Sequence, residues 1–374
     1  MDILPPSSRP VLVQWMIDTR HLWPEATQTR QLATVIAQAS RALAALLSDE
    51  ERAGVLKYFH VRDARMALAS QLLKHLVVAR CAGSGDAPVP WRRTVLSRDK
   101  HGKPVYYKDA NDSGAQPIVF NVSHQAGLVV LVAVYGGDVR QKDGSSDNSG
   151  FQVGIDIVSP SERRTRDHEM IADEARRSGG SSGAASSSGW PRFVDMHADV
   201  LAPGEVRHLK QLPAASGDDQ RLRLFYGLWC LREAYVKMTG EALLAEWLAD
   251  LEFRDFRVPG VSATVDKNNS RDNDNGNGNG NGNGDLVQGG EMVTQHDIRF
   301  RDTPVGDSVN VCLRSVGTDY MVCTAVRGVT PGDETAPTAA AYKAAALALP
   351  TTDAIEVLQM DDILDFVHRS ETAH

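Results

Sequence analysis

Phe151-Gln152-Val153-Gly154-Ile155-Asp156-Ile157-Val158 is an apolar run with one acidic residue near its centre. Turn-forming residues lie on both sides of it, and a short apolar run bounded in this way is typical of a buried β-strand. Burying a lone carboxylate costs several kcal/mol unless the carboxylate is paired with a cation or binds a metal ion. We therefore expect Asp156 to have such a partner.

A second apolar segment, Trp229-Cys230-Leu231-Arg232-Glu233-Ala234-Tyr235-Val236-Lys237, also carries charged residues. On a helix, residues four apart share a face, so Glu233 and Lys237 line up on one side. An exposed pair of this kind would be an ordinary surface salt bridge, but the apolar neighbours favour a functional interpretation. Two carboxylates, Asp156 and Glu233, with a lysine one turn away would suit Mg²⁺ and a polyphosphate.

The composition is that of an ordinary soluble globular protein, with 374 residues, 42% apolar and 24% charged. The net charge of -8 argues against a general nucleic-acid binder, which is usually basic. Four cysteines lie in apolar contexts without metal-type spacing and are expected to be reduced core residues. No secretion signal or membrane span is recognised in the sequence, so we expect a cytoplasmic protein with no membrane partner.

Apolar periodicity predicts an alternation of helices and strands that occurs twice along the chain. Helices are expected over residues 29–47, 62–82, 200–212 and 220–239. Strands are expected over residues 11–17, 91–96, 117–123, 128–135, 251–258, 292–301, 308–315 and 320–326, in addition to 151–158. The repeated order predicts an α+β protein with α/β-type halves, residues 1–150 and 151–330.

Two segments of low complexity interrupt the second half. Residues 178–189 are almost all Ser, Gly and Ala, and residues 268–284 form an Asn-Gly repeat. Neither composition can bury enough apolar area to offset chain entropy, so we expect disordered insertions. Residues 331–374 are expected to form a linker followed by a short amphipathic helix, over residues 353–369, that packs on the body or on a partner.

Three weaker signals involve polar residues in or beside turns. Asn121-Val122-Ser123-His124 ends an apolar strand, where polar side chains can hold a ligand or simply stabilise the turn. Gly102-Lys103-Pro104 follows Arg98, and such a basic turn can bind phosphate or be a solvated loop. Arg52 follows a predicted helix N-terminus at residues 48–51.

Taken in order, Asn-Val-Ser-His at 121–124, Val-Gly-Ile-Asp at 153–156 and Trp-x-x-Arg-Glu-Ala-x-x-Lys at 229–237 resemble the surfactin-type 4′-phosphopantetheinyl transferases. The resemblance covers residues 48–326 and is closest to eukaryotic members of broad specificity, of a filamentous-fungal type. It implies two pseudo-symmetric subdomains with coenzyme A bound at their interface. It also implies transfer of phosphopantetheine from coenzyme A to a serine of an apo carrier protein, with Mg²⁺ as cofactor.

The resemblance assigns roles to individual residues. Asp156 and Glu233 would bind Mg²⁺, and Lys237 would bind the pyrophosphate. Glu233, beside the metal, is also the candidate base for the serine proton. The expected catalytic residues are therefore Asp156, Glu233 and Lys237. Coenzyme A would be bound by a larger set: Arg52, Arg98, Gly102, Lys103, Pro104, Asn121, Ser123, His124 and Lys237. Glu205 occupies the place of a further acidic residue of the family, with no defined role.

The chain departs from the family pattern at two positions. Many bacterial members have a second carboxylate two residues after the metal-binding aspartate, where this chain has Val158. We expect a water, held by Gln125, to take that place, because Mg²⁺ readily retains waters. Arg232 stands where a lysine is usual, which keeps the charge but changes the geometry.

The expected partners are carriers of fatty acid synthases, polyketide synthases, non-ribosomal peptide synthetases and aminoadipate reductase. Two similar halves within one chain would make a monomer sufficient. The alternative interpretation is a coenzyme A-binding sensor or scaffold that has lost catalysis, because one carboxylate is replaced by Val158. A third possibility is an interaction protein whose function lies in the Asn-Gly tract.

Overall fold

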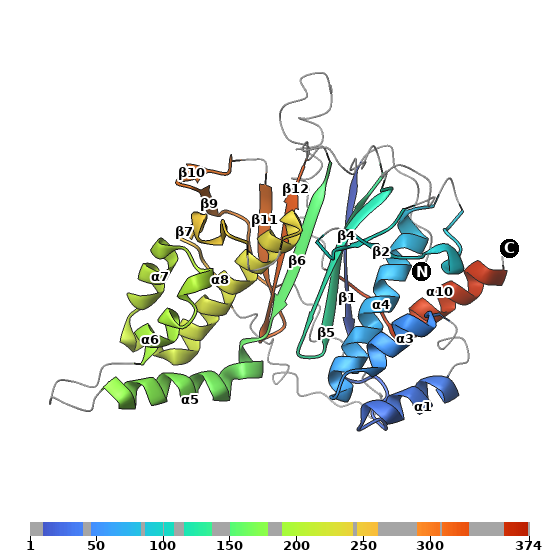
Figure 1. Ribbon diagram of the computed structural model, residues 1–374, viewed down its shortest axis with the longest axis horizontal. Coiled ribbons are helices and arrows are strands. Elements are labelled where there is room, and N and C mark those ends of the chain that lie inside the picture. The colour runs from blue at the N-terminus through green and yellow to red at the C-terminus, as the bar shows by residue number, and fades with distance from the viewer. Residues whose placement is uncertain are drawn as a thin grey trace, which may run out of the picture.

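The computed structural model describes residues 10–39, 46–83, 87–99, 101–107, 116–136, 150–178, 189–241, 245–260, 290–306, 309–328 and 355–372. These residues form two halves that lie side by side, each a sheet covered by helices (Figure 1). The predicted Asn-Gly insertion at residues 268–284 lies entirely outside the described residues. So do residues 329–354, which contain most of the predicted linker, and residues 179–188 of the insertion predicted at 178–189.

The N-terminal half is built around a four-stranded sheet with the order β13-β1-β5-β4. Its elements in chain order are β1 (Val11–Asp18), α1 (Thr29–Ala39), α3 (Asp49–Leu56), α4 (Val61–Cys81), the 3₁₀ helix η1 (Trp91–Arg93), β2 (Ser97–Arg98), β3 (Pro104–Val105), β4 (Ile118–Gln125) and β5 (Leu128–Tyr135). The long helix α4 packs on β4 and β5, and 15 of its 21 residues are buried.

The C-terminal half contains a second four-stranded sheet with the order β6-β12-β11-β8 and a smaller sheet with the order β10-β9-β7. Its helices are α5 (Pro160–Ser178), α6 (Trp190–Asp195), α7 (Pro203–Lys210) and α8 (Gly217–Thr239), with 3₁₀ helices η2 (Ala198–Val200), η3 (Ala214–Ser216) and η4 (Leu248–Asp250). Its strands are β6 (Gln152–Val158), β7 (Leu251–Arg254), β8 (Met292–Val293), β9 (Asp297–Phe300), β10 (Thr303–Pro304), β11 (Val309–Val316) and β12 (Tyr320–Arg327).

The two halves repeat one topology. In the first, β1 pairs antiparallel with β5, which pairs antiparallel with β4; in the second, β6 pairs in the same way with β12, and β12 with β11. A long helix, α4 or α8, follows the first strand of each half and packs on its sheet (Figure 1). The prediction of an α+β fold with two similar halves is confirmed.

Apolar side chains between the two sheets hold the halves together. Val130 and Val132 of β5 belong to the same buried cluster as Val153 and Ile155 of β6. Each half also has a core of its own between its sheet and its helices. The strand β6 therefore buries one face against the N-terminal half and the other against α8, as its continuous apolar run predicts.

The C-terminal segment completes the N-terminal half. The strand β13 (Glu356–Val357) pairs parallel with β1, and the helix α10 (Met360–Thr372) packs against α4 (Figure 1). Ile363 and Phe366 of α10 are buried in the N-terminal core. The expected amphipathic helix is therefore present, and it packs on the body.

Most predicted elements are present with small shifts in their ends, but the strand predicted over residues 91–96 is wrong. Residues Trp91–Arg93 form a 3₁₀ helix, because the indole of Trp91 turns inward and its Nε1 donates to the carbonyl of Leu46 at 2.8 Å. The hydroxyl of Thr94 closes this turn by donating to the carbonyl of Trp91 at 2.6 Å. The helix α5 was not predicted at all.

Candidate functional site

Three predicted site residues meet where β4, β6 and α8 come together. The carboxylate of Asp156 on β6 accepts hydrogen bonds at Oδ1 from the ammonium of Lys237 at 2.6 Å and from the hydroxyl of Ser123 at 2.8 Å. The ammonium of Lys237 also donates to the Ser123 hydroxyl at 3.0 Å. Asp156 is buried, and a buried carboxylate in an apolar strand requires a cationic partner. Lys237 is that partner.

The electrostatics keep Lys237 charged. Burial alone would lower the pKa of its ammonium, but the charge of Asp156 and the hydrogen bond to it outweigh this effect, and the pKa is raised. Lys237 is therefore protonated at neutral pH and can neutralise an anion that approaches Asp156.

Glu233 lies one turn before Lys237 on α8 and is half-buried. Burial and the negative charge of Asp156 raise the pKa of Glu233, against the opposing effect of Lys237. Among the described residues its carboxylate has no hydrogen-bond donor. Two neighbouring carboxylates, one without a donor, form an acidic site that attracts a cation.

This pair of carboxylates fits the requirements of Mg²⁺, which is usually held by one or two carboxylates together with waters and substrate phosphates. The described residues contain no cluster of three or more His, Cys, Asp and Glu side chains, so a protein-only metal cage is not present in that part of the chain. Val158 is buried in the core of the C-terminal half and offers no ligand. Gln125 is half-buried at the end of β4.

Gly154 allows α8 to approach β6 closely enough for these contacts. A Cβ atom at this position would lie 2.1 Å from the carbonyl oxygen of Ala234 and 2.4 Å from the backbone nitrogen of Met238. Gly154 and Asp156 are two residues apart and so point to the same face of β6. The glycine of the Val-Gly-Ile-Asp motif thus positions α8, a role that the sequence analysis did not assign.

Asn121 and Lys103 contact the edge of β6 that faces the N-terminal half. The side-chain oxygen of Asn121 accepts from the backbone N–H of Ile155 at 3.3 Å, and the Lys103 ammonium donates to the carbonyl of Val153 at 2.9 Å. Burial lowers the pKa of Lys103 to about 8. Both predicted ligand-binding residues therefore satisfy backbone groups of β6 that pair with no described strand on this side.

The Gly102-Lys103-Pro104 segment forms a tight turn between β2 and β3. Gly102 has φ +82°, a left-handed conformation that favours glycine, and Asp99 accepts from the backbone N–H of Lys103 at 2.8 Å. Arg98 pairs with Pro104 across the turn and donates to the carbonyl of Gly102 at 2.7 Å. The turn thereby directs Lys103 toward β6.

His124 lies between the two halves. Its ring is exposed, and the neighbouring protein together with the positive charge of Lys237 lowers its pKa, so the imidazole is neutral at pH 7. Lys74 and Asp63, both on α4, also act on this ring electrostatically. His124 is thus close to groups from α4 and from α8.

Arg52 lies on α3 and forms an ion pair with Asp49 of the same helix. A capping box formed by Ser48 and Glu51 starts the helix, as the sequence predicts. His75 of α4 then fixes α3 in place, because its Nε2 lies 2.8 Å from the carboxylate of Glu51. Arg52 therefore belongs to the N-terminal half, where it pairs with Asp49.

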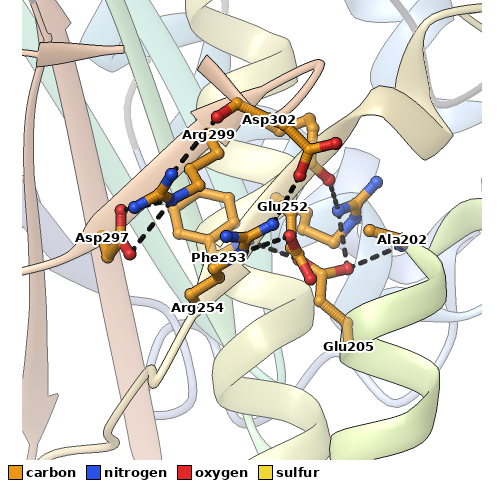
Figure 2. A network of polar contacts seen from close by, with 10 residues as sticks. Ala202, Glu205, Glu252, Phe253, Arg254, Asp297, Arg299 and Asp302 are labelled. Atoms are coloured by element: carbon orange, nitrogen blue, oxygen red, sulfur yellow. Dashed lines mark hydrogen bonds and ion pairs between the residues drawn. The ribbon is translucent and has the colours of Figure 1, made fainter. Parts of the chain in front are cut away.

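Glu205 has a structural role in the C-terminal half. Its carboxylate forms a buried ion pair with Arg232 at 2.7 Å and accepts from the backbone N–H groups of Ala202 and Phe253, both at 2.8 Å (Figure 2). Arg232 also donates to the carbonyl of Leu251 at 2.7 Å. The pair joins α7, α8 and β7, so the arginine that replaces the usual lysine serves this network.

Comparison with known proteins identifies the family of this chain. Residues 35–136 match the family model described as 4′-phosphopantetheinyl transferase, N-terminal, and residues 152–276 match that of the 4′-phosphopantetheinyl transferase superfamily. The chain is 40% identical over 329 residues to 4′-phosphopantetheinyl transferase 1 of Fusarium mangiferae, covering 87% of this chain and 90% of the relative.

Two further relatives are also named as phosphopantetheinyl transferases. The chain is 31% identical over 352 residues to the 4′-phosphopantetheinyl transferase NpgA of Emericella nidulans, covering 88% of this chain and 86% of the relative. It is 32% identical over 234 residues to the L-aminoadipate-semialdehyde dehydrogenase-phosphopantetheinyl transferase of Schizosaccharomyces pombe, covering 61% and 68%. The chain therefore belongs to the 4′-phosphopantetheinyl transferase family, and it is an enzyme of that kind.

Proposed function

We propose that Asp156, Glu233 and Lys237 carry out the transfer of phosphopantetheine from coenzyme A to a serine of an apo carrier protein. The observation that supports this most directly is the cluster of Asp156, Lys237 and Ser123, with Glu233 one turn away. Its members come from β4, β6 and α8, so a substrate bound there contacts both halves of the molecule. Use of coenzyme A and of apo carriers is the general chemistry of this family.

In the proposed reaction the serine oxygen attacks the phosphorus nearer to pantetheine. The bond from that phosphorus to adenosine 3′,5′-bisphosphate breaks, and the serine proton passes to Glu233 directly or through a water. The raised pKa of Glu233, caused by burial and by Asp156, makes it a better proton acceptor than an ordinary glutamate. Lys237 neutralises charge on the transferred phosphate, since phosphoryl transfer depends mainly on positioning and electrostatics.

Asp156 and Glu233 would hold Mg²⁺, with a water near Val158 that Gln125 holds in place of the missing carboxylate. When bound, the ion neutralises the pyrophosphate and the leaving phosphate. Before any ion binds, Lys237 supplies the positive charge that Asp156 needs.

Coenzyme A would lie across the junction between the halves. Ser123, His124, Arg52 and Arg98 would contact its phosphates and nucleotide. The Gly102-Lys103-Pro104 turn and Asn121 would line the same region while holding the edge of β6, as their contacts with Val153 and Ile155 support.

The proposed carriers are those of fatty acid synthases, polyketide synthases, non-ribosomal peptide synthetases and aminoadipate reductase; the name of the relative from S. pombe supports the last. We propose a cytoplasmic monomer. No described helix is long and apolar enough to span a bilayer.

An intact-mass assay of an apo carrier incubated with the protein, coenzyme A and Mg²⁺ tests this function. We expect a mass gain of one phosphopantetheine that disappears with EDTA. Glu233→Gln should lower kcat at least about a hundredfold because it removes the base, while the Kd for coenzyme A stays within about threefold. Glu169→Gln, on the exposed face of α5, is the matched control and should leave kcat unchanged.

Unchanged turnover in Glu233→Gln would refute the role of Glu233. Absence of any mass gain with carriers of all four classes, despite measurable coenzyme A binding, would favour a binding protein without catalysis.

A further inference from the structure

Phe59, in the turn between α3 and α4, is the most exposed large apolar residue in the described part of the chain, with 90% of its surface accessible. The other exposed large apolar residues of that part are Leu56, Val95 and Met196. Leu56 is 38% exposed and lies only three residues before Phe59, at the end of α3. A single exposed apolar side chain is ordinary, but two in one turn form a patch that needs a reason.

The turn that carries Phe59 is well held. The hydroxyl of Thr29 on α1 donates to the carbonyl of Phe59 at 3.3 Å, and Tyr58 and Val61 pack against the N-terminal core on either side of it. The ring of His60 lies edge-on to the Phe59 ring, with the centroids 4.9 Å apart. The fold therefore holds the Phe59 ring in solvent, and a partner that covered it would have little backbone to order.

The polar residues around this ring are basic. Residues 56–62 contain a lysine, a histidine and an arginine, all exposed, and no acidic residue, although the whole chain has a net charge of -8. Aromatic residues and arginine are enriched in protein interfaces, and a positive rim attracts a negatively charged partner. We call this surface the Phe59 patch and define it as Leu56, Lys57, Phe59, His60 and Arg62.

The Phe59 patch reaches the junction between the two halves. The guanidinium of Arg62 lies 3.6 Å from the carboxylate of Glu162, which is in the first turn of α5 and six residues after Asp156. The Arg62 side chain is still 63% exposed, so this contact leaves it accessible. Asp63, the next residue of α4, acts electrostatically on the ring of His124. The patch is therefore next to the candidate site and outside it.

We propose that the Phe59 patch is a docking surface for the apo carrier protein, with Phe59 against an apolar position of the carrier and Lys57 and Arg62 facing its carboxylates. This inference rests on the proposed function, in which the carrier serine must reach Asp156 and Glu233. A carrier placed in that way has to rest on the surface around the junction. An acidic helical carrier fits an aromatic centre with a basic rim. The N-terminal half thereby takes part in choosing the carrier.

Steady-state kinetics of the full chain at saturating coenzyme A test the proposal, with the apo carrier that the intact-mass assay shows to be modified fastest. Phe59→Ser should raise the KM for the carrier about tenfold, as expected for loss of an aromatic anchor, and leave kcat and the Kd for coenzyme A within about twofold. Phe59→Trp should keep most of the affinity. Val95→Ser removes another exposed apolar side chain, outside the patch, and is the matched control.

The basic rim is tested by charge reversal. Lys57→Glu should raise the KM for the carrier about tenfold at low ionic strength, and the difference from the wild type should shrink as salt is added. Arg207→Glu, at an exposed position on α7, is the matched control and should leave this KM unchanged.

A carrier KM in Phe59→Ser within about twofold of the wild type, or an equal rise in Val95→Ser, would overturn the docking surface. Co-sedimentation with vesicles of phosphatidylcholine and phosphatidylserine tests a membrane as the rival partner. Vesicle binding that Phe59→Ser abolishes, with an unchanged carrier KM, would assign the patch to lipid and overturn the proposal. If the wild type modified no carrier, the proposed function would be wrong and the docking surface with it.

Discussion

Replacing Gly154 with alanine tests the close approach of α8 to β6. The added Cβ would lie 2.1 Å from the carbonyl oxygen of Ala234, whereas ordinary van der Waals contact begins at 3.4 Å, so α8 would have to withdraw by about 1.3 Å at this point. The obstacle is helix backbone, which cannot turn aside as a flexible side chain can. Gly154→Ala should therefore separate Lys237 and Glu233 from Asp156.

The structure sets the size of the effect. The Lys237–Asp156 distance of 2.6 Å would lengthen past ordinary hydrogen-bond range after such a withdrawal. A misplacement of about 1 Å can lower a rate about a hundredfold, and overpacking a core costs about 1–3 kcal/mol. We expect kcat to fall about a hundredfold and the free energy of unfolding to fall by about 1–3 kcal/mol.

Carrier modification followed by intact mass, together with urea unfolding, measures both quantities. Gly54→Ala is the control, because Gly54 lies in the helix α3 with nothing within 4 Å of an added Cβ. That substitution should raise the free energy of unfolding by about 0.5–1 kcal/mol and leave kcat unchanged. Gly154→Ala with wild-type kcat and stability would refute the argument.

Two further predictions concern stability. Arg232→Met leaves the buried carboxylate of Glu205 without its counter-charge and should lower the free energy of unfolding by about 3–5 kcal/mol in urea; a change below about 1 kcal/mol would contradict the role given to this pair. Hydrogen bonds from His75 and Ser48 overcome burial and lower the pKa of Glu51 from 4.5 to about 2. Its stabilisation, about 1–2 kcal/mol after solvent screening, is therefore complete above about pH 4.5 and is lost as the pH falls toward 2. Urea unfolding at pH 5 and pH 3 should show a smaller difference for Glu51→Gln than for the wild type, and equal differences would contradict the assignment.

Elements whose apolar pattern reflects their own burial could be predicted from the sequence. The β4–β5 hairpin and α8 are examples, since nearly every inward-facing position is apolar. The helix α5 is mostly polar and was missed. It is held by contacts with α8, such as that between Asp167 and the hydroxyl of Tyr226 and the ion pair of Arg164 with Asp219, and local sequence does not reveal such contacts.

The candidate site was found because charged residues in apolar runs are costly and so require partners. Asp156 and Lys237 were recognised by this rule, and the structure pairs them. Lys74 carries the same signal in an apolar helix and was passed over. Glu205 and Arg232 could not be paired from the sequence, because 27 residues separate them and neither one's neighbours identify its partner.

The position of β13 and α10 has a consequence for the order of folding during synthesis. Domains generally fold as the chain leaves the ribosome, beginning at the N-terminus. Here β1 gains its outer neighbour, and α4 gains part of its cover, only from residues 355–372. The second half of the molecule can therefore be complete while the first still has an open sheet edge and an uncovered helix surface. The half that is translated first is the half that is finished last.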